Sequence, residues 1–228
     1  MKCTFHFHWP VLFKCPVTSI GPMDLTFLQR LGKALKNAHV MLRSRGLRQS
    51  TGLVLPDEPM AIAGMLYVKA KEAKASLGHV ASSSWATADG HTLGLWVIDR
   101  NYDVAKSRER MTSTDQVKGL QETLSSSDQE SHIVLVPMKL SPQAKKETLN
   151  ADVFLFDDLL IDLTKHEWAI PHVPVSLTLA REFLGGALEP SDLPVLPLSD
   201  PMARWFGFAA GTIVRIDNPT MVSYRIVA

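Results

Sequence analysis

Apolar residues recur at helical spacing along residues 24–46. Successive apolar positions are three or four residues apart, so they share one side of an amphipathic helix. The stripe consists of Leu28, Leu31, Leu35, Ala38 and Leu42. Gly46 follows it, and glycine ends helices readily because it enters the left-handed conformation without a Cβ clash. This pattern predicts one helix with one buried face.

The rest of the first 150 residues alternates between helical and strand patterns. Residues 59–78 are predicted to be helical, residues 82–92 to be a polar, turn-rich loop, and Leu93–Ile98 to be a buried strand. Helical character resumes at 103–124, followed by a flexible connection at 125–131 and a strand at 132–138. Ser141 and Pro142 then suit the N-cap and first position of another helix. Such alternation is typical of an α/β layer.

From about residue 151 the segments become short and rich in proline. Residues 176–186 predict a helix capped by Ser176, and residues 199–207 predict another that begins at Asp200 and Pro201 and ends at Gly207. Residues 212–216 and 221–227 are β-branched strands joined closely enough to form a hairpin. We therefore expect three parts: an N-terminal extension (1–22), an α/β domain (23–150) and a small α+β domain (151–228).

The N-terminal extension does not resemble a signal peptide, because histidine, lysine and proline interrupt its apolar positions. The chain also lacks an apolar run of transmembrane length, so we expect an intracellular protein without a membrane partner. Its two cysteines, Cys3 and Cys15, give no disulfide framework. Together with His6 and His8 they do not follow a recognised zinc spacing, so we expect no metal site.

Charge divides unevenly along the chain. Residues 1–150 carry 19 Lys and Arg against 13 Asp and Glu, a net +6, whereas residues 151–228 carry 5 against 10, a net −5. The first helix contributes several of the basic positions on its polar side, namely Arg30, Lys33, Lys36, Arg43 and Arg45. A basic region suits a polyanion such as nucleic acid, although a charged helix face is more often simply solvated.

Common catalytic motifs are absent from the sequence. One pattern, Asp57 with Glu72 and Lys74, imitates the signature of metal-dependent nucleases, in which paired carboxylates bind Mg²⁺. That signature requires the second acid and the lysine on a strand, whereas residues 67–77 are predicted to be helical. His166 and His172 lie six residues apart without a further ligand nearby, so we expect a turn held by a hydrogen bond.

The last third resembles one family: the two-domain fifth subunit shared by eukaryotic nuclear RNA polymerases, whose archaeal relatives have only the C-terminal domain. A predicted strand at 159–164 leads into the turn His166–His172, as it does in that family. A short helix and Leu193-Pro194 follow. The most specific motif is Asp200-Pro201-Met202-Ala203-Arg204-Trp205-Phe206-Gly207 with Gly211 before a strand, and the end Ser223-Tyr224-Arg225 matches as well. The likeness is weaker over residues 24–150, and residues 1–22 have no counterpart.

The resemblance implies a scaffold and not an enzyme. It implies a jaw domain with a nuclease-like but non-catalytic α/β layer along downstream double-stranded DNA, and an assembly domain that docks on the largest polymerase subunit in the nucleus. No catalytic residue, cofactor or metal is expected. The DNA-proximal positions would be Lys139, Pro142, Lys145 and Lys146. The assembly and structural positions would be His166, Pro171, His172, Asp200, Pro201, Arg204, Gly207, Gly211, Tyr224 and Arg225.

Three departures separate this chain from the family pattern. Ala209-Ala210 stands where a Lys-Arg pair is usual, the Asn218-Pro219-Thr220 connection is several residues shorter, and Phe183–Gly186 replaces a basic helix end. These changes favour a divergent paralogue that serves one polymerase class. Two alternatives stay open: a nuclease using Asp57, Glu72 and Lys74, and a stand-alone DNA-binding protein.

Overall fold

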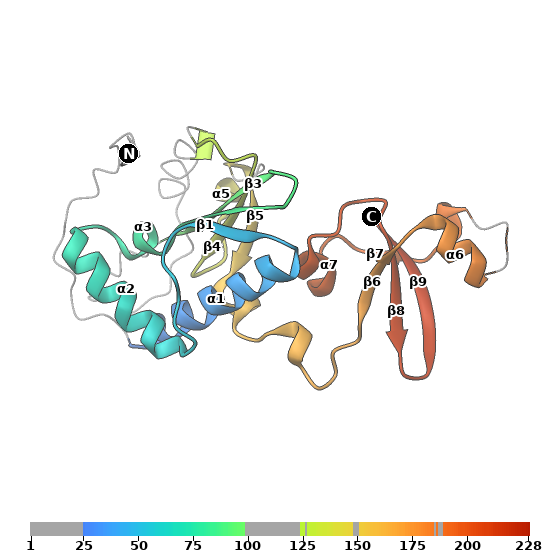
Figure 1. Cartoon of the computed structure of the whole chain (residues 1–228), viewed down its shortest axis with the longest axis horizontal. Coiled ribbons are helices and arrows are strands. Elements are labelled where there is room, and N and C mark those ends of the chain that lie inside the picture. Colours follow the sequence, from blue (N-terminus) through green and yellow to red (C-terminus); the bar gives the residue numbers. More distant parts are fainter. Residues whose placement is uncertain (1–24, 99–123, 126, 148–150, 185, 187–188) are drawn as a thin grey trace, which may run out of the picture.

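The computed structural model describes residues 25–98, 124–125, 127–147, 151–184, 186 and 189–228. Two separate β-sheets organise these residues (Figure 1). The first sheet and its helices form one half of the molecule, the second sheet forms the other half, and helix α7 lies between them beside the end of helix α1. The fold is therefore mixed α/β with two sheets.

The first sheet has the order β1-β2-β3-β4-β5. Its strands are β1 (Arg48–Thr51), β2 (Ser83–Ala86), β3 (Thr92–Val97), β4 (Ser131–Val136) and β5 (Asp152–Leu155). The first three strands pair antiparallel, and β3, β4 and β5 pair parallel. The strands predicted at 93–98 and 132–138 are confirmed as β3 and β4. Because β5 pairs with β4, the first sheet extends past the expected division at residue 150.

The loop predicted at residues 82–92 is wrong in its first half, where β2 forms. The error comes from Ser83, a buried polar residue that made the segment look like a solvated turn. Its hydroxyl accepts a hydrogen bond of 2.9 Å from the indole nitrogen of Trp85, which is also buried. The serine is thus satisfied inside the protein, and the alternation of inward positions continues through it.

Helices cover both faces of the first sheet. They are α1 (Leu25–Ser44), α2 (Pro59–Ala73), α3 (Leu77–Ala81) and α5 (Pro142–Glu147). The predicted stripe of α1 is confirmed, since Leu31, Leu35, Ala38 and Leu42 are fully buried against the sheet in the larger core. A smaller core, which includes Ala144 of α5, lies on the opposite face. The helix predicted at 59–78 is interrupted at Lys74, whose φ is +50°, and residues 103–123 of another predicted helix lie outside the described residues.

The second sheet has the order β6-β8-β9-β7 and two thin cores. Its strands are β6 (His172–Val175), β7 (Val195–Leu196), β8 (Ile213–Asn218) and β9 (Met221–Val227). Helix α6 (Leu177–Leu184) packs through Ala180 on one face, and α7 (Pro201–Phe206) packs through Ala203 on the other. The predicted hairpin is confirmed as β8–β9, and the caps at Ser176 and Asp200 are confirmed as well. Together these elements form the C-terminal module, residues 161–228.

In the described part of the chain, the 3-10 helices η1 (Phe156–Leu159) and η2 (Leu163–Lys165) lie between β5 and β6 and so connect the two sheets, whereas η3 (Pro190–Asp192) lies between α6 and β7. The strand expected at 159–164 is therefore wrong. Leu159 is buried in the first core, and its carbonyl accepts a hydrogen bond of 2.7 Å from the side-chain amide of Asn37 on α1. Asp162 then caps η2 through the backbone N–H of Thr164. No helix in the described part of the chain is long and apolar enough to cross a membrane.

Candidate interaction surfaces

The segment that was expected to lie near DNA forms a short, anchored helix. Pro142 occupies the start of α5, and the hydroxyl of Ser141 accepts a hydrogen bond of 3.2 Å from the backbone N–H of Ala144. Ala144 is fully buried against β4. The basic residues of this segment, Lys139, Lys145 and Lys146, are exposed. The fold thus presents three cations from one fixed surface element.

The basic side of α1 is less available than its sequence suggests. Arg30 forms an ion pair of 2.8 Å with Asp157 and also donates to the carbonyl oxygen of Pro137 at 3.3 Å. Arg45 turns away from solvent toward α7. Lys33 and Arg43 stay exposed. The acidic helix η1 lies along α1, so the two charged segments partly neutralise each other and leave a smaller basic surface.

The nuclease-like pattern is not arranged as a metal site. Asp57 lies in the bend before α2, Glu72 lies within α2, and Lys74 is the C-cap of that helix. The second acid and the lysine are therefore not on a strand, as the predicted helix implied. Within the described residues, no three His, Cys, Asp or Glu side chains are grouped as metal ligands. The N-terminal positions Cys3, His6, His8 and Cys15 lie outside those residues.

The histidines of the 166–172 turn make local hydrogen bonds. Nδ1 of His166 accepts from the backbone N–H of Trp168 at 3.2 Å. Nδ1 of His172 lies 2.7 Å from the carbonyl oxygen of Ile170, which accepts its proton. The adjacent carbonyl of Pro171 accepts from the backbone N–H of Asp217 at 3.1 Å, which joins the turn to β8. These contacts agree with the expected turn.

The Asp200–Gly211 motif builds helix α7 and the turn after it. One carboxylate oxygen of Asp200 accepts from the backbone N–H groups of Met202 at 2.8 Å and Ala203 at 3.1 Å, and Pro201 takes the first helical position. Gly207 ends the helix with φ +67°, and Gly211 has φ +86°. Both positions are in the left-handed region that glycine tolerates best. The motif therefore specifies a helix with sharp boundaries.

The terminal positions Tyr224 and Arg225 hold the second sheet together. Tyr224 is buried, and its ring stacks on that of Phe183 with centroids 6.3 Å apart. The guanidinium of Arg225 donates to the carbonyl oxygen of Val195 on β7 at 3.3 Å. This bond to the backbone joins β9 to β7.

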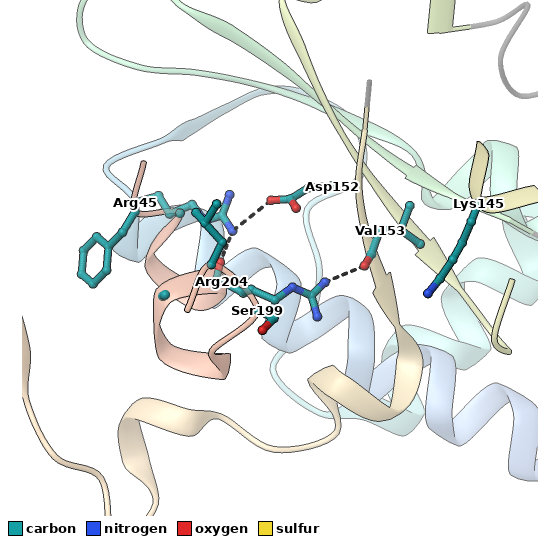
Figure 2. Close-up of a pocket in the computed structure, with 10 residues that line it drawn as sticks. Arg45, Lys145, Asp152, Val153, Ser199 and Arg204 are labelled. Atoms are coloured by element: carbon teal, nitrogen blue, oxygen red, sulfur yellow. Dashed lines mark hydrogen bonds and ion pairs between the residues drawn. The ribbon is translucent and has the colours of Figure 1, made fainter. Parts of the chain in front are cut away.

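Two arginines meet at the junction of the two sheets (Figure 2). Arg45, at the end of α1, donates to the carbonyl oxygens of Arg204 and of Trp205, the latter at 2.9 Å. Arg204 in turn donates to the carbonyl oxygen of Val153 on β5 at 2.6 Å and lies 4.1 Å above the ring of Phe154. Burial lowers the pKa of Arg45, and Asp152, 3.8 Å away, partly opposes that effect.

An open, shallow cleft lies over this junction. Its lining consists of Arg45, Lys145, Asp152, Val153, Leu198, Ser199, Ala203, Arg204, Gly207 and Phe208. The sequence placed Arg45 on the polar side of the first helix, either solvated or near nucleic acid, and gave Trp205 no role apart from the motif. One signal was available for Trp205: it lies two residues from Ala203, so the two side chains must leave a short helix on different sides. The side occupied by Arg45 follows only from the packing.

Comparisons with known proteins agree with the motif at the C-terminal end. Residues 161–227 match the family model "RNA polymerase Rpb5, C-terminal domain". The subunits RPABC1 of "DNA-directed RNA polymerases I, II, and III" from Caenorhabditis briggsae and Caenorhabditis elegans are each 30% identical over 107 residues, covering 42% of this chain and 51% of the relative. The corresponding subunit of Dictyostelium discoideum is 25% identical over 104 residues, covering 42% and 53%.

The chain spans about half the length of the curated relatives it matches. The family model covers residues 161–227, which include β6 to β9 and helices α6 and α7 but not the first sheet. The family model and the individual relatives both indicate a likeness to the same RNA polymerase subunit. The C-terminal module is similar to the C-terminal domain of Rpb5, a subunit of RNA polymerases.

Proposed function

We propose that this chain is a non-catalytic structural subunit of a nuclear DNA-directed RNA polymerase. The observation that carries the proposal is the match of residues 161–227 to the Rpb5 C-terminal domain. In this segment the motif residues serve as helix caps, turn residues and sheet contacts. Residues used in this way maintain a shape, and a fixed shape is what a subunit needs for docking.

The C-terminal module docks on the largest subunit of the polymerase. Its outer surface carries apolar side chains that a monomer gains nothing by exposing. They include Ile161 (57% exposed), Trp168 (77%), Phe183 (64%), Val195 (52%), Met221 (67%) and Val222 (52%). The positions that depart from the family pattern, Ala209, Ala210 and the 218–220 turn, are exposed as well. Surface changes of this kind alter partner choice without altering the fold, so the chain serves one polymerase class.

Co-purification tests this assignment. The full chain is tagged, purified from its own cells at native expression, and the large subunits that accompany it are identified. We expect one largest subunit of a nuclear RNA polymerase in a high-mass complex. Recovery of the largest subunits of all three nuclear polymerases would reject the specialisation, and a free monomer without any of them would reject the subunit assignment.

The first half of the chain lies along downstream DNA and contacts phosphates without reading sequence. The exposed lysines at 139, 145 and 146 support this role, since Lys145 and Lys146 project from α5, which Ser141 and Ala144 fix to the sheet, and Lys139 lies in the segment just before it. Each phosphate contact adds about 0.9 to the slope of log affinity against log salt concentration. Three contacts would therefore be visible as a change in salt dependence.

A pair of triple variants tests the DNA contact in the assembled polymerase. We expect Lys139→Ala, Lys145→Ala and Lys146→Ala together to lower the salt slope of elongation-complex stability by about 2–3. The matched control replaces Lys69, Lys71 and Lys74, which are also exposed but lie on α2 and at its C-cap; it should leave the slope unchanged. Equal slopes for both triple variants would show that α5 does not contact DNA.

A further inference from the structure

We propose that Arg45 and Arg204 form a clamp that fixes the C-terminal module at one angle to the first sheet, so that the two halves move as one body. This clamp belongs to the chain itself and is present whether or not the chain is assembled in a polymerase. Its basis is that helix α7 belongs to both halves. Ala203 faces the core of the second sheet, whereas Trp205, two residues later, is fully buried in the core of the first.

The two arginines cross the junction in opposite directions: Arg45 reaches from the first half to α7, and Arg204 reaches from α7 back to the first half. Arg45 extends from the end of α1 to the last carbonyl groups of α7, those of Arg204 and Trp205. The carbonyl of Arg204 also accepts from the backbone N–H of Gly207 at 3.2 Å, and a cation at the C-terminal end of a helix interacts favourably with the helix dipole. Arg204 extends back from α7 to the carbonyl oxygen of Val153 on β5 and to the carboxylate of Asp158 in η1 at 3.4 Å. The two planar guanidinium groups thus connect α1, β5 and η1 of the first half to α7.

One side of the clamp faces the open cleft, and its remaining contacts favour the observed positions of the two arginines. Arg204 lies over the ring of Phe154, which favours a cation. The side chain of Arg45 is only 11% exposed, and a Cβ atom added at Gly207 would lie 3.0 Å from its guanidinium carbon. Gly207 therefore ends α7 and also leaves space for Arg45. The two arginines resist rotation of the halves, because a pivot breaks their hydrogen bonds to the carbonyls of Arg204, Trp205 and Val153.

A rigid junction has a mechanical consequence. The surface that carries Lys139 and Lys146 and the surface that carries Trp168 and Phe183 belong to opposite halves. If the clamp holds, displacement of one surface is transmitted to the other without loss at a hinge. If the clamp opens, Trp205 still anchors α7 in the first core, but the relative orientation of the two halves becomes more variable.

Distance measurements between two spin labels test the clamp. Nitroxides are placed on Ala88→Cys, in the turn between β2 and β3, and on Thr220→Cys, in the β8–β9 turn, after Cys3→Ser and Cys15→Ser remove the native thiols. Both labelled positions are exposed. We expect one narrow distance distribution in this background and at least a doubling of its width when Arg45→Ala and Arg204→Ala are added. Arg43→Ala, an exposed arginine of the same helix, should leave the width unchanged.

Two further measurements separate a loosened junction from a failure to fold. Far-UV circular dichroism of the double variant should equal that of the labelled parent, and its thermal unfolding should divide from one transition into two. If the double variant is unfolded, Arg45→Lys replaces it, because lysine keeps the charge but lacks the planar fork that contacts two carbonyls. A folded variant with an unchanged narrow distribution, or a broad distribution in the labelled parent, would overturn the proposal.

Discussion

The two halves of this molecule are stabilised in different ways. The first sheet lies under a large, continuous core in which Leu31, Leu35 and Leu42 of α1 are fully buried. The second sheet has two thin cores, one on each face, each with four buried residues. Its shape depends more on Asp200, Pro201, Gly207 and other residues that begin or end elements.

This difference explains where the likeness to known proteins is visible. A core of interchangeable apolar residues tolerates many sequences as long as volume and pattern are kept. A module built from caps and left-handed turns needs particular residue types at particular positions. The family model accordingly matches residues 161–227, where such residues set the shape.

The largest expected effect comes from the residue that crosses this division. Trp205 belongs to the C-terminal motif but is buried in the first core. We expect Trp205→Ala to lower the free energy of unfolding by about 3–5 kcal/mol, because a large side chain leaves a cavity. Denaturant titration measures it. Trp168→Ala, at a tryptophan 77% exposed, should cost less than about 0.5 kcal/mol; comparable losses would mean that α7 does not bridge the halves.

Lowering the pH should weaken the first half through His39. This residue is buried on α1, neither ring nitrogen has a hydrogen-bond partner among the described residues, and its ring meets Trp85 edge-on at 4.8 Å. Burial, with a smaller contribution from Arg43, lowers its pKa from 6.5 to about 4. The unfolded chain therefore binds the proton first, so this stability is present above pH 6.5 and is lost as the pH falls from 6.5 to 4.

The expected loss over that range is about 3 kcal/mol. Measurement of the free energy of unfolding at pH 7 and pH 4 checks it, and His39→Leu should remove that part of the decrease. His91→Gln is the control, because the exposed His91 has a pKa raised by its hydrogen bond to Glu130, which gives a dependence of opposite sign. If His39→Leu lost as much free energy of unfolding between pH 7 and pH 4 as the wild type, His39 would be excluded as the cause of the loss.

The smallest expected effect tests the capping that distinguishes the second half. Asp200→Ala removes the acceptor for two backbone N–H groups at the start of α7 and should cost about 1 kcal/mol. Asp200→Asn keeps an acceptor oxygen and should lose much less. Thermal unfolding of both variants measures the difference. If alanine and asparagine were equivalent, the cap would not contribute to the stability of the module.

Local sequence patterns correctly predicted the helices, caps and turns that depend on only a few neighbouring residues. The stripe of α1, the cap at Ser141, the start of α7 and the β8–β9 hairpin each depend on neighbours in the chain, and each was predicted correctly. Strand β2 was missed because Ser83 looks solvated until Trp85 is seen to satisfy it. The strand expected at 159–164 was wrong because η1 and η2 form there, and the carbonyl of Leu159 accepts a hydrogen bond from Asn37, more than a hundred residues earlier, and not from a neighbouring strand.

The sequence by itself determined most of the elements, many of their boundaries and the likeness of the C-terminal module to Rpb5. Capping, turn formation and apolar periodicity depend on residues close together in the chain, so they can be predicted from the sequence. Only the tertiary structure decided that β5 continues the first sheet, that Trp205 enters the first core and that Arg45 faces α7. Those outcomes depend on which surfaces meet after the chain has folded, because burial and hydrogen bonding at a junction are set jointly by segments far apart in sequence.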